Sequence, residues 1–285
     1  MKYFRAIPNI EVSNITGVNT LATNIMMRTE LLPSLLDNPA LFYQYDMQDG
    51  DTPETIAAKY YGDSYRYWLV MYGNQIFDPQ WDIPLSNYNF DLYLNDKYAN
   101  AANTCLNLTM LSGGSGDYQE NEIVYQGTSL NNSTASGQVI YWNSTTRTLL
   151  VSDVSGNFEM SIPVIGVQSD VIYNLNYTTP VSVLAYTQEQ THEYQKIVKT
   201  LDTGTGTTSI NTFVIDQDTY NNTPNEDVGI TYTIPKGYPV SVTISRNKLS
   251  IYDYETQTNE AKRSINIIDV KYAIPLENQL ISLLK

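Results

Sequence analysis

The chain has 285 residues, of which 42% are hydrophobic and 16% charged, a balance typical of a globular protein rather than a disordered one. Its net charge of −14 argues against nucleic acid and membrane surfaces as partners, because both are bound through clustered lysine and arginine. A single cysteine, Cys105, and a single histidine, His192, exclude an internal disulfide and a Cys/His zinc site.

No catalytic, metal or cofactor site is expected. His192 has no recognisable nucleophile beside it, so a structural or surface role is predicted, and Cys105 is expected to be a small buried residue. The stretch "DQDTYNNTPNED" begins like a calcium loop, but Asn221 stands where glycine is needed and Asp227 where glutamate is expected. We predict a solvated loop there, and a simple turn at "TGTGTT". The chain is predicted not to be an enzyme.

The first residues lack the apolar stretch of an export signal, and no apolar run reaches the length of a membrane span. The chain is therefore expected to be made in a cytosol and kept there or built into a particle. Its 24 tyrosines suit ordinary strand positions and hydrated interfaces equally well.

Residues 1–40 are predicted to form an arm with one short helical segment, "TNIMMRTELLPSLL", broken at Pro33. A half-buried strand follows, because Tyr43, Tyr45 and Met47 alternate with polar residues. The next residues, "DGD", indicate a turn in which Gly50 takes a positive φ.

Two short helices are predicted after this turn. Thr52 caps the first, Pro53 suits its first position, and Gly62 ends it, while Ile56, Ala57, Tyr60 and Tyr61 mark its buried face. Asp63 or Ser64 caps the second, in which Tyr65, Trp68, Leu69 and Tyr72 share a face and Gly73 is last. Asn74 is expected to bond local backbone, and "IPL" (residues 83–85) to begin an extended exit strand.

Beyond this block the pattern changes to short alternating runs. Residues 105–175 are predicted to form a small antiparallel β module, with a barrel as the expected form and "NSTT" joining one hairpin. The Thr/Gly-rich "LDTGTGTTSINTF" separates it from the strand-like "VGITYTIP" and "YPVSVTISR". The end, "PLENQLISLLK", predicts an amphipathic helix with Pro275 in its first turn and an apolar face of Leu276, Leu280, Leu283 and Leu284.

The stretch "DGDTPETIAAKYYG" resembles the opening of the LysM fold. The resemblance implies a β-α-α-β core within an α+β protein, and LysM modules commonly bind N-acetylglucosamine polymers, so binding of peptidoglycan or chitin oligomers is an alternative function. The motif residues are Gly50, Asp51, Thr52, Ile56, Ala57, Gly62, Trp68, Asn74 and Pro84. Trp68 is most simply a core residue, whereas Trp81 is expected in a loop, in a packing or partner contact.

In its longer form, to "DPQWDIPLS", the block is similar to the LysM-like domain of the T4-like phage baseplate wedge subunit, the gene fifty-three product family. "ATNIMMR" (residues 22–28) and "NEAKRSINIIDVKYAIPLENQLISLL" (residues 259–284) resemble that family's arm and C-terminal segment. The resemblance implies a structural virion component, assembled in the host cytoplasm, that clamps wedge proteins and joins neighbouring wedges next to the sheath-initiating subunit.

The residue patterns and this resemblance together predict an arm (1–40), a LysM-like domain (41–104), an inserted β module (105–175) and a β-rich C-terminal region with the terminal helix (176–285). It also suggests residues for partner contact, although "NEAKR" could equally be a charged helix face. The candidates are Asn24, Arg28, Tyr61, Trp81, Asp82, Asn259, Glu260, Arg263 and Ile265.

Overall fold

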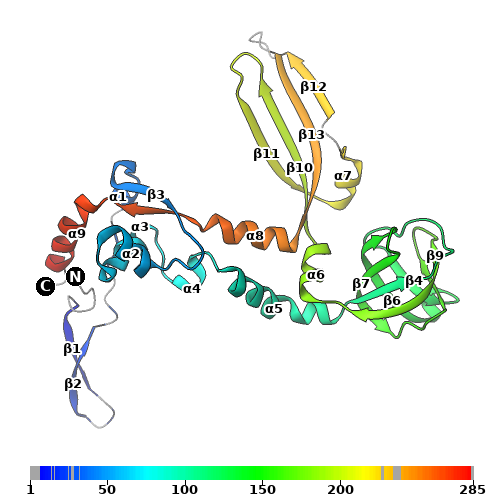
Figure 1. Cartoon of the computed structure of the whole chain (residues 1–285), viewed down its shortest axis with the longest axis horizontal. Helices are drawn as coiled ribbons and strands as arrows, with labels where there is room; N and C mark the ends of the chain where they lie inside the picture. Colours follow the sequence, from blue (N-terminus) through cyan, green and yellow to red (C-terminus); the bar gives the residue numbers. More distant parts are fainter. Residues whose placement is uncertain are drawn as a thin grey trace. The chain divides into compact units, whose positions relative to one another are not determined.

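The computed structural model describes residues 7–13, 15, 17–24, 26, 29–31, 33–225, 228–233 and 239–283. The chain forms two compact units, one made of residues 1–90 together with 257–285 and the other of residues 91–256. Helices and antiparallel strands both contribute, so the predicted α+β class is confirmed (Figure 1). The chain passes from one unit to the other within helix α5 (Asn87–Asn103) and returns within α8 (Ile251–Ala261).

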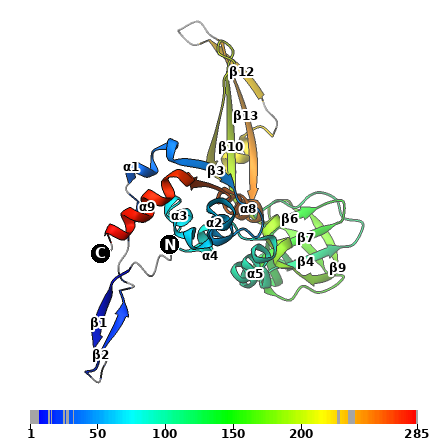
Figure 2. The ribbon, with the colours of Figure 1, turned by 60° about the vertical axis from the view of Figure 1, so that its left-hand side comes forward.

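The first unit is built on a two-stranded antiparallel sheet. Strand β3 (Phe42–Asp46) pairs with β14 (Ser264–Ile268), with Tyr45 opposite Ile265. Helix α2 (Pro53–Tyr61), the 3-10 helix η3 (Ser64–Arg66) and α3 (Tyr67–Gly73) follow β3 in the chain. One core joins these helices to the two strands and to the C-terminal helix α9 (Val270–Leu283); β3, α2, α3 and α9 are labelled in Figure 2. The core contains Met47, Ile56, Trp68, Leu69, Ile265, Ile267 and Leu280.

The predicted exit strand at residues 83–86 is wrong, because these residues form no strand. The position beside β3 is occupied by β14, whose alternating Ile265 and Ile267 bury an apolar face that "IPLS" does not offer. Tyr65 also departs from the prediction: it is exposed, because Asp63 caps a 3-10 turn that precedes α3 and shifts Tyr65 off the helix face.

The N-terminal arm contains a hairpin that the sequence did not reveal, formed by β1 (Asn9–Ser13) and β2 (Asn19–Thr23). The helix predicted across residues 23–36 is wrong for the described part of this stretch, in which only Pro33–Leu36 (α1) are helical. The 3-10 helix η2 (Pro39–Leu41) follows. Pro33 begins this helix instead of breaking one, since its fixed φ suits a first helical position.

The C-terminal helix, α9 (Val270–Leu283), begins earlier than predicted and holds Pro275 in its interior. An interior proline costs a backbone hydrogen bond, here to the carbonyl of Lys271. Burial of Ala273 and Leu280 on either side of it fixes the helix against the core and offsets that cost. Leu276 is half-buried as expected, whereas the Leu283 side chain and Leu284 lie outside the described residues.

The second unit contains the predicted antiparallel module, which is a closed six-stranded barrel of order β4-β7-β6-β5-β8-β9 (Figure 1). Its core includes Leu108, Val124, Leu149 and Leu175. The predicted hairpin pairs Asn143 with Thr148. The strands are β4 (Leu106–Met110), β5 (Ile123–Gly127), β6 (Ser133–Asn143), β7 (Thr148–Gly156), β8 (Pro163–Gly166) and β9 (Ile172–Pro180), with the 3-10 helix η4 (Leu130–Asn132) before β6.

Helix α6 (Val183–Glu189) leads into a second antiparallel sheet of order β11-β10-β13-β12. Its strands are β10 (Thr191–Asp202), β11 (Thr208–Ile215), β12 (Val228–Thr233) and β13 (Pro239–Ser250). The expected turn at "TGTGTT" joins β10 to β11, and "SINTF" belongs to β11. The solvated loop predicted after it is wrong, because residues 217–222 form α7 (Gln217–Asn222), for which Asp216 provides the N-cap.

Candidate interaction surfaces

The turn before α2 is held by the Asp51 carboxylate. This buried side chain accepts hydrogen bonds from the Tyr45 hydroxyl at 2.7 Å, the Gln48 backbone N–H at 2.9 Å and the Lys59 ammonium at 2.6 Å. Burial opposes ionisation of Asp51, but these bonds outweigh it and lower the pKa of the carboxyl. Both carboxylate oxygens are thus engaged inside the unit.

The other motif residues around α2 are also structural. Thr52 caps α2 and Gly62 ends it in the left-handed conformation at φ 69°, both as predicted from the sequence. The structure adds that Thr52 forms a capping box with Thr55. Gly50 likewise has a positive φ of 80°. The remaining members of the helical motif lie in the core, where they are almost fully buried: Ile56, Ala57 and Trp68.

Asn74 joins the end of α3 to the distant strand β14. Its side-chain amide donates to the carbonyls of Val70 and Asn266, both at 2.8 Å, and its oxygen accepts from the Asn266 N–H at 2.6 Å. The bond to local backbone was expected, whereas the pair of bonds to Asn266 joins residues 192 positions apart. Asn74 therefore helps to align β14 for its pairing with β3.

Three of the predicted partner residues, Tyr61, Arg263 and Ile265, make contacts within the first unit. Ile265 is buried in the core, and the buried Tyr61 hydroxyl donates to the Ile268 carbonyl at 2.9 Å. Burial raises the pKa of Tyr61. Arg263 makes two bonds to the Glu260 carboxylate and one to the Met47 carbonyl at 2.8 Å, which closes the end of β3. These side chains organise the unit that any partner would meet.

Exposed aromatic side chains are presented by a short segment that we call the aromatic turn, residues 77–82. Phe77 is 80% exposed and Trp81 49% exposed. The sequence placed Trp81 in a loop, but it lies in the short helix α4 (Pro79–Asp82), for which Asp78 is the N-cap. Phe77 was not among the predicted partner residues; the only signal for it in the sequence was a large aromatic directly before an Asp-Pro helix start.

Three side chains hold the aromatic turn and the residues after it. Asp82 accepts the backbone N–H groups of Asp78 at 2.8 Å and Phe77 at 2.9 Å, and these bonds lower its pKa. Lys262 donates to the Trp81 carbonyl at 2.6 Å. Asn259 bonds both backbone groups of Leu85, at 2.7 and 3.2 Å, beside the half-buried Pro84. The exposed aromatics are thus carried by a fixed backbone.

The last two partner candidates belong to the arm. Asn24 is half-buried, and its N–H donates to the Pro8 carbonyl at 3.0 Å, which closes the base of the β1–β2 hairpin. Arg28 lies outside the described residues.

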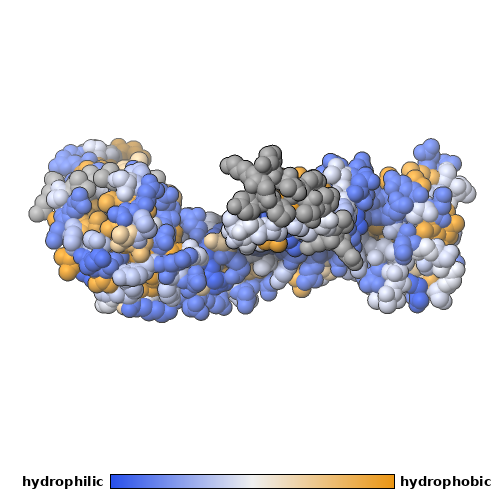
Figure 3. All heavy atoms as spheres, turned by 90° about the horizontal axis from the view of Figure 1, so that it is seen from above, coloured by the Kyte–Doolittle hydropathy of each residue, from blue (hydrophilic) through white to orange (hydrophobic). Residues whose placement is uncertain are grey.

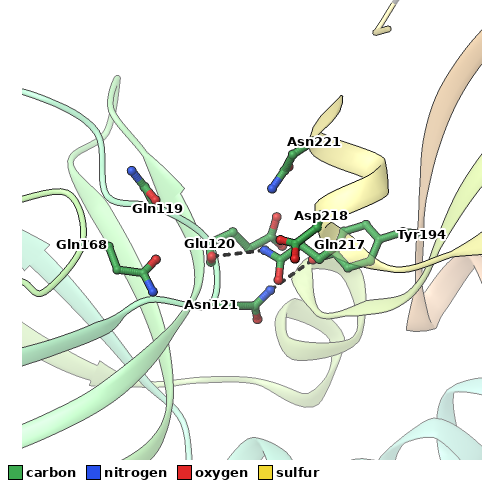
Figure 4. A pocket seen from close by; sticks show the side chains of 8 residues that line it. All are labelled: Gln119, Glu120, Asn121, Gln168, Tyr194, Gln217, Asp218 and Asn221. Carbon is green, nitrogen blue, oxygen red and sulfur yellow. Dashed lines mark hydrogen bonds between the residues drawn. The ribbon is translucent and has the colours of Figure 1, made fainter. Parts of the chain in front are cut away.

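In the second unit, a polar junction connects the barrel to the second sheet (Figure 4). Asn121 donates to the Tyr194 hydroxyl at 3.1 Å, and Thr191 donates to the Glu120 carboxylate, which also pairs with Lys248. A cavity of about 570 Å³ beside these bonds is lined only by polar side chains and Tyr194: Gln119, Glu120, Asn121, Gln168, Gln217, Asp218 and Asn221. Half of these lining residues are exposed and the other half are half-buried, which indicates a hydrated cleft.

The two residues considered for chemistry have structural surroundings. His192 stacks on Tyr254 with ring centroids 3.7 Å apart, and Cys105 is buried as expected, which raises the pKa of its thiol. Among the described residues, no group of three or more His, Cys, Asp or Glu side chains could hold a metal ion. In the same part of the chain, no helix combines the length and apolar character needed to cross a membrane.

Hydrophobic residues on the face seen in Figure 3 form small separate patches among hydrophilic ones.

Comparison with known proteins gives one family match. Residues 25–102 match the family described as base plate wedge protein 53. This segment covers just over a quarter of the chain and includes β3, α2, α3 and the aromatic turn, but neither the barrel, the second sheet nor β14. No curated protein matches the chain. Through this segment the chain is identified as a structural, non-enzymatic component of a phage baseplate, located in the virion together with other baseplate proteins.

Proposed function

We propose that the chain clamps wedge proteins of the baseplate and joins neighbouring wedges during tail assembly, next to the sheath-initiating subunit. The aromatic turn is the contact that we assign to this role. The observation that carries the proposal is the exposure of Phe77 and Trp81 on a backbone held by Asp82, Lys262 and Asn259. Large aromatic side chains on a fixed backbone contribute contact area with little loss of entropy on binding.

We further propose that the core of the first unit is LysM-like, with β14 as its second strand. This is supported by the order β3, α2, α3, β14, by the antiparallel pairing of the two strands, and by the helix signals at Thr52 and Gly62. In this arrangement the barrel and the second sheet are one long insertion between α3 and the closing strand. Binding of N-acetylglucosamine polymers remains the alternative prediction. The hydrogen-bonding groups of Asp51 and Thr52 are, however, already engaged in bonds within the unit, which leaves fewer of them for a sugar.

The test is the double variant Phe77→Ala/Trp81→Ala, introduced into the full chain and into the phage. Tyr65→Ala is the matched control, because Tyr65 is similarly exposed in the same unit. Loss of two interface anchors should weaken capture of wedge proteins from the same phage by about 100-fold, whereas the control should bind as the wild type does.

Equal capture by all three chains would remove the aromatic turn from the interface. The same chains are tested for retention on insoluble peptidoglycan. Retention on peptidoglycan without capture of wedge proteins would replace the assembly role by the glycan-binding alternative.

A further inference from the structure

The second sheet of residues 191–250 lacks a core over much of its length. No described side chain is buried in residues 196–202 of β10, 208–214 of β11 or 240–246 of β13. Both faces nevertheless carry apolar side chains, such as Ile197 and Val198 on successive positions of β10. A four-stranded sheet normally buries at least one face, so this one offers surfaces that an assembled neighbour would cover.

Strand β11 forms one edge of this sheet, as Figure 1 shows. It pairs with β10 over eight residue pairs without a bulge. Because β11 is the first strand in the sheet order, its other side has no neighbouring strand among the described residues. Every residue from Thr208 to Val214 is exposed, including Ile210 at 61%, Phe213 at 53% and Val214 at 68%.

The sequence of β11, "TSINTFVI", lacks the features that usually protect an edge strand. Exposed edges generally carry lysine, proline or a bulge, because unpaired N–H and C=O groups otherwise attract another strand. This strand has no charge and no proline, and it is rich in β-branched and aromatic residues. A regular, uncharged edge about 25 Å long is a template for strand addition.

We infer that another baseplate protein donates an extended segment that pairs with β11 as a fifth strand of this sheet. The inference rests on the baseplate role but not on the aromatic turn, since β11 lies in the other compact unit. Main-chain hydrogen bonds along β11 would supply affinity, and the alternating side chains on its two faces would supply specificity.

Charge indicates the chemistry of this segment. Lys199 lies opposite Ile210, and Lys196 lies opposite Phe213, so each face of β11 has one lysine on the strand behind it. A segment of apolar and β-branched residues without basic side chains fits this pattern, because basic side chains beside these lysines would be repelled. A second copy of this chain fits less well, because each copy carries a net charge of −14 and two copies repel each other.

The first test is Thr212→Lys, with Ser245→Lys as its matched control. Thr212 and Ser245 lie on one cross-strand row and one face, on either side of Ile197, but only Thr212 is at the edge. A lysine at the edge should reduce the amount of the chain in purified baseplates by at least about tenfold, while the control should change it less than about twofold. Circular dichroism of both purified variants establishes that each is folded.

The second test identifies the occupant. Thr212 is replaced by photoreactive benzoylphenylalanine in the phage, and the cross-linked peptides of purified, irradiated baseplates are sequenced by mass spectrometry. An extended segment of another baseplate protein cross-linked at position 212 is the expected result. Cross-links to a second copy of this chain, or no cross-link together with normal incorporation of Thr212→Lys, would overturn the inference.

The experiments distinguish failure of the added strand at β11 from failure of the aromatic turn as a contact. Normal incorporation of Thr212→Lys alongside loss of wedge-protein capture by Phe77→Ala/Trp81→Ala would remove only the added strand. The reverse pattern would remove only the aromatic turn.

Discussion

At the residue scale, the acidic side chains singled out by the sequence act on the chain's own backbone. Asp82 binds two N–H groups of the aromatic turn, and Asp51 holds the turn before α2. The sequence singled out Asp51 as a motif residue and Asp82 as a candidate partner residue. Both act over short stretches of chain, since every bond named for them joins residues no more than eight positions apart. Asn259 is different: its bonds to Leu85 cross 174 positions, which no local pattern reveals.

Asp51→Asn tests the turn. The substitution removes the charge that pairs with Lys59 and should lower the free energy of unfolding at pH 7 by about 1–2 kcal/mol. Because the pKa of Asp51 is lowered on folding from 3.8, its stabilising effect is complete above that pH and is lost as pH falls through the folded value.

Urea unfolding at several pH values measures this effect. The difference between wild type and Asp51→Asn should shrink below about pH 4. Asp49→Asn, an exposed neighbour, is the control and should differ little from wild type at any pH. A constant difference between wild type and Asp51→Asn down to pH 2 would contradict the role of the charge.

At the element scale, the sequence predicted the ends of a helix correctly where they are set by capping residues. Thr52, Pro53 and Gly62 predicted both ends of α2, because the N-cap and the left-handed C-cap depend only on nearby backbone. The same logic explains α7, whose N-cap Asp216 was interpreted as the start of a calcium-like loop. Pro275 failed as a boundary signal, since the packing of α9 outweighs the local cost of an interior proline.

Gly62→Ala tests the C-cap of α2 in isolation. A Cβ atom at this position would meet nothing within 4 Å, so the cost comes from the positive φ alone. We expect the free energy of unfolding to fall by about 1 kcal/mol. Gly62→Asn should cost less, because asparagine tolerates the left-handed region, and equal losses in chemical denaturation would contradict this explanation.

At the scale of the whole molecule, the first unit depends on residues from both ends of the chain. Its strand β3 lies in the family-matched segment, whereas β14 and α9 come from beyond residue 256. Buried Ile265, Ile267 and Ile268 belong to that distant part. A chain ending before them would leave β3 unpaired and the core open.

Truncation after residue 256 tests this dependence. The first unit should unfold, so limited proteolysis should cut within residues 42–73, while the barrel of residues 106–180 should persist as a resistant fragment. Deletion of the exposed β1–β2 hairpin, residues 9–23, is the control and should leave residues 42–73 resistant. Resistance of those residues in the truncated chain would show that β14 is dispensable.

The sequence by itself determined the α+β class, the caps of α2, the antiparallel module and its central hairpin, and the likeness to a baseplate wedge protein, because these features depend on residues close together in the chain. The three-dimensional structure was needed to establish that β14 rather than residues 83–86 completes the small sheet, that Asn259 and Ile265 serve the interior, and that Phe77 and the edge of β11 face outward. These depend on contacts between distant residues, where burial and backbone pairing in three dimensions override local preference.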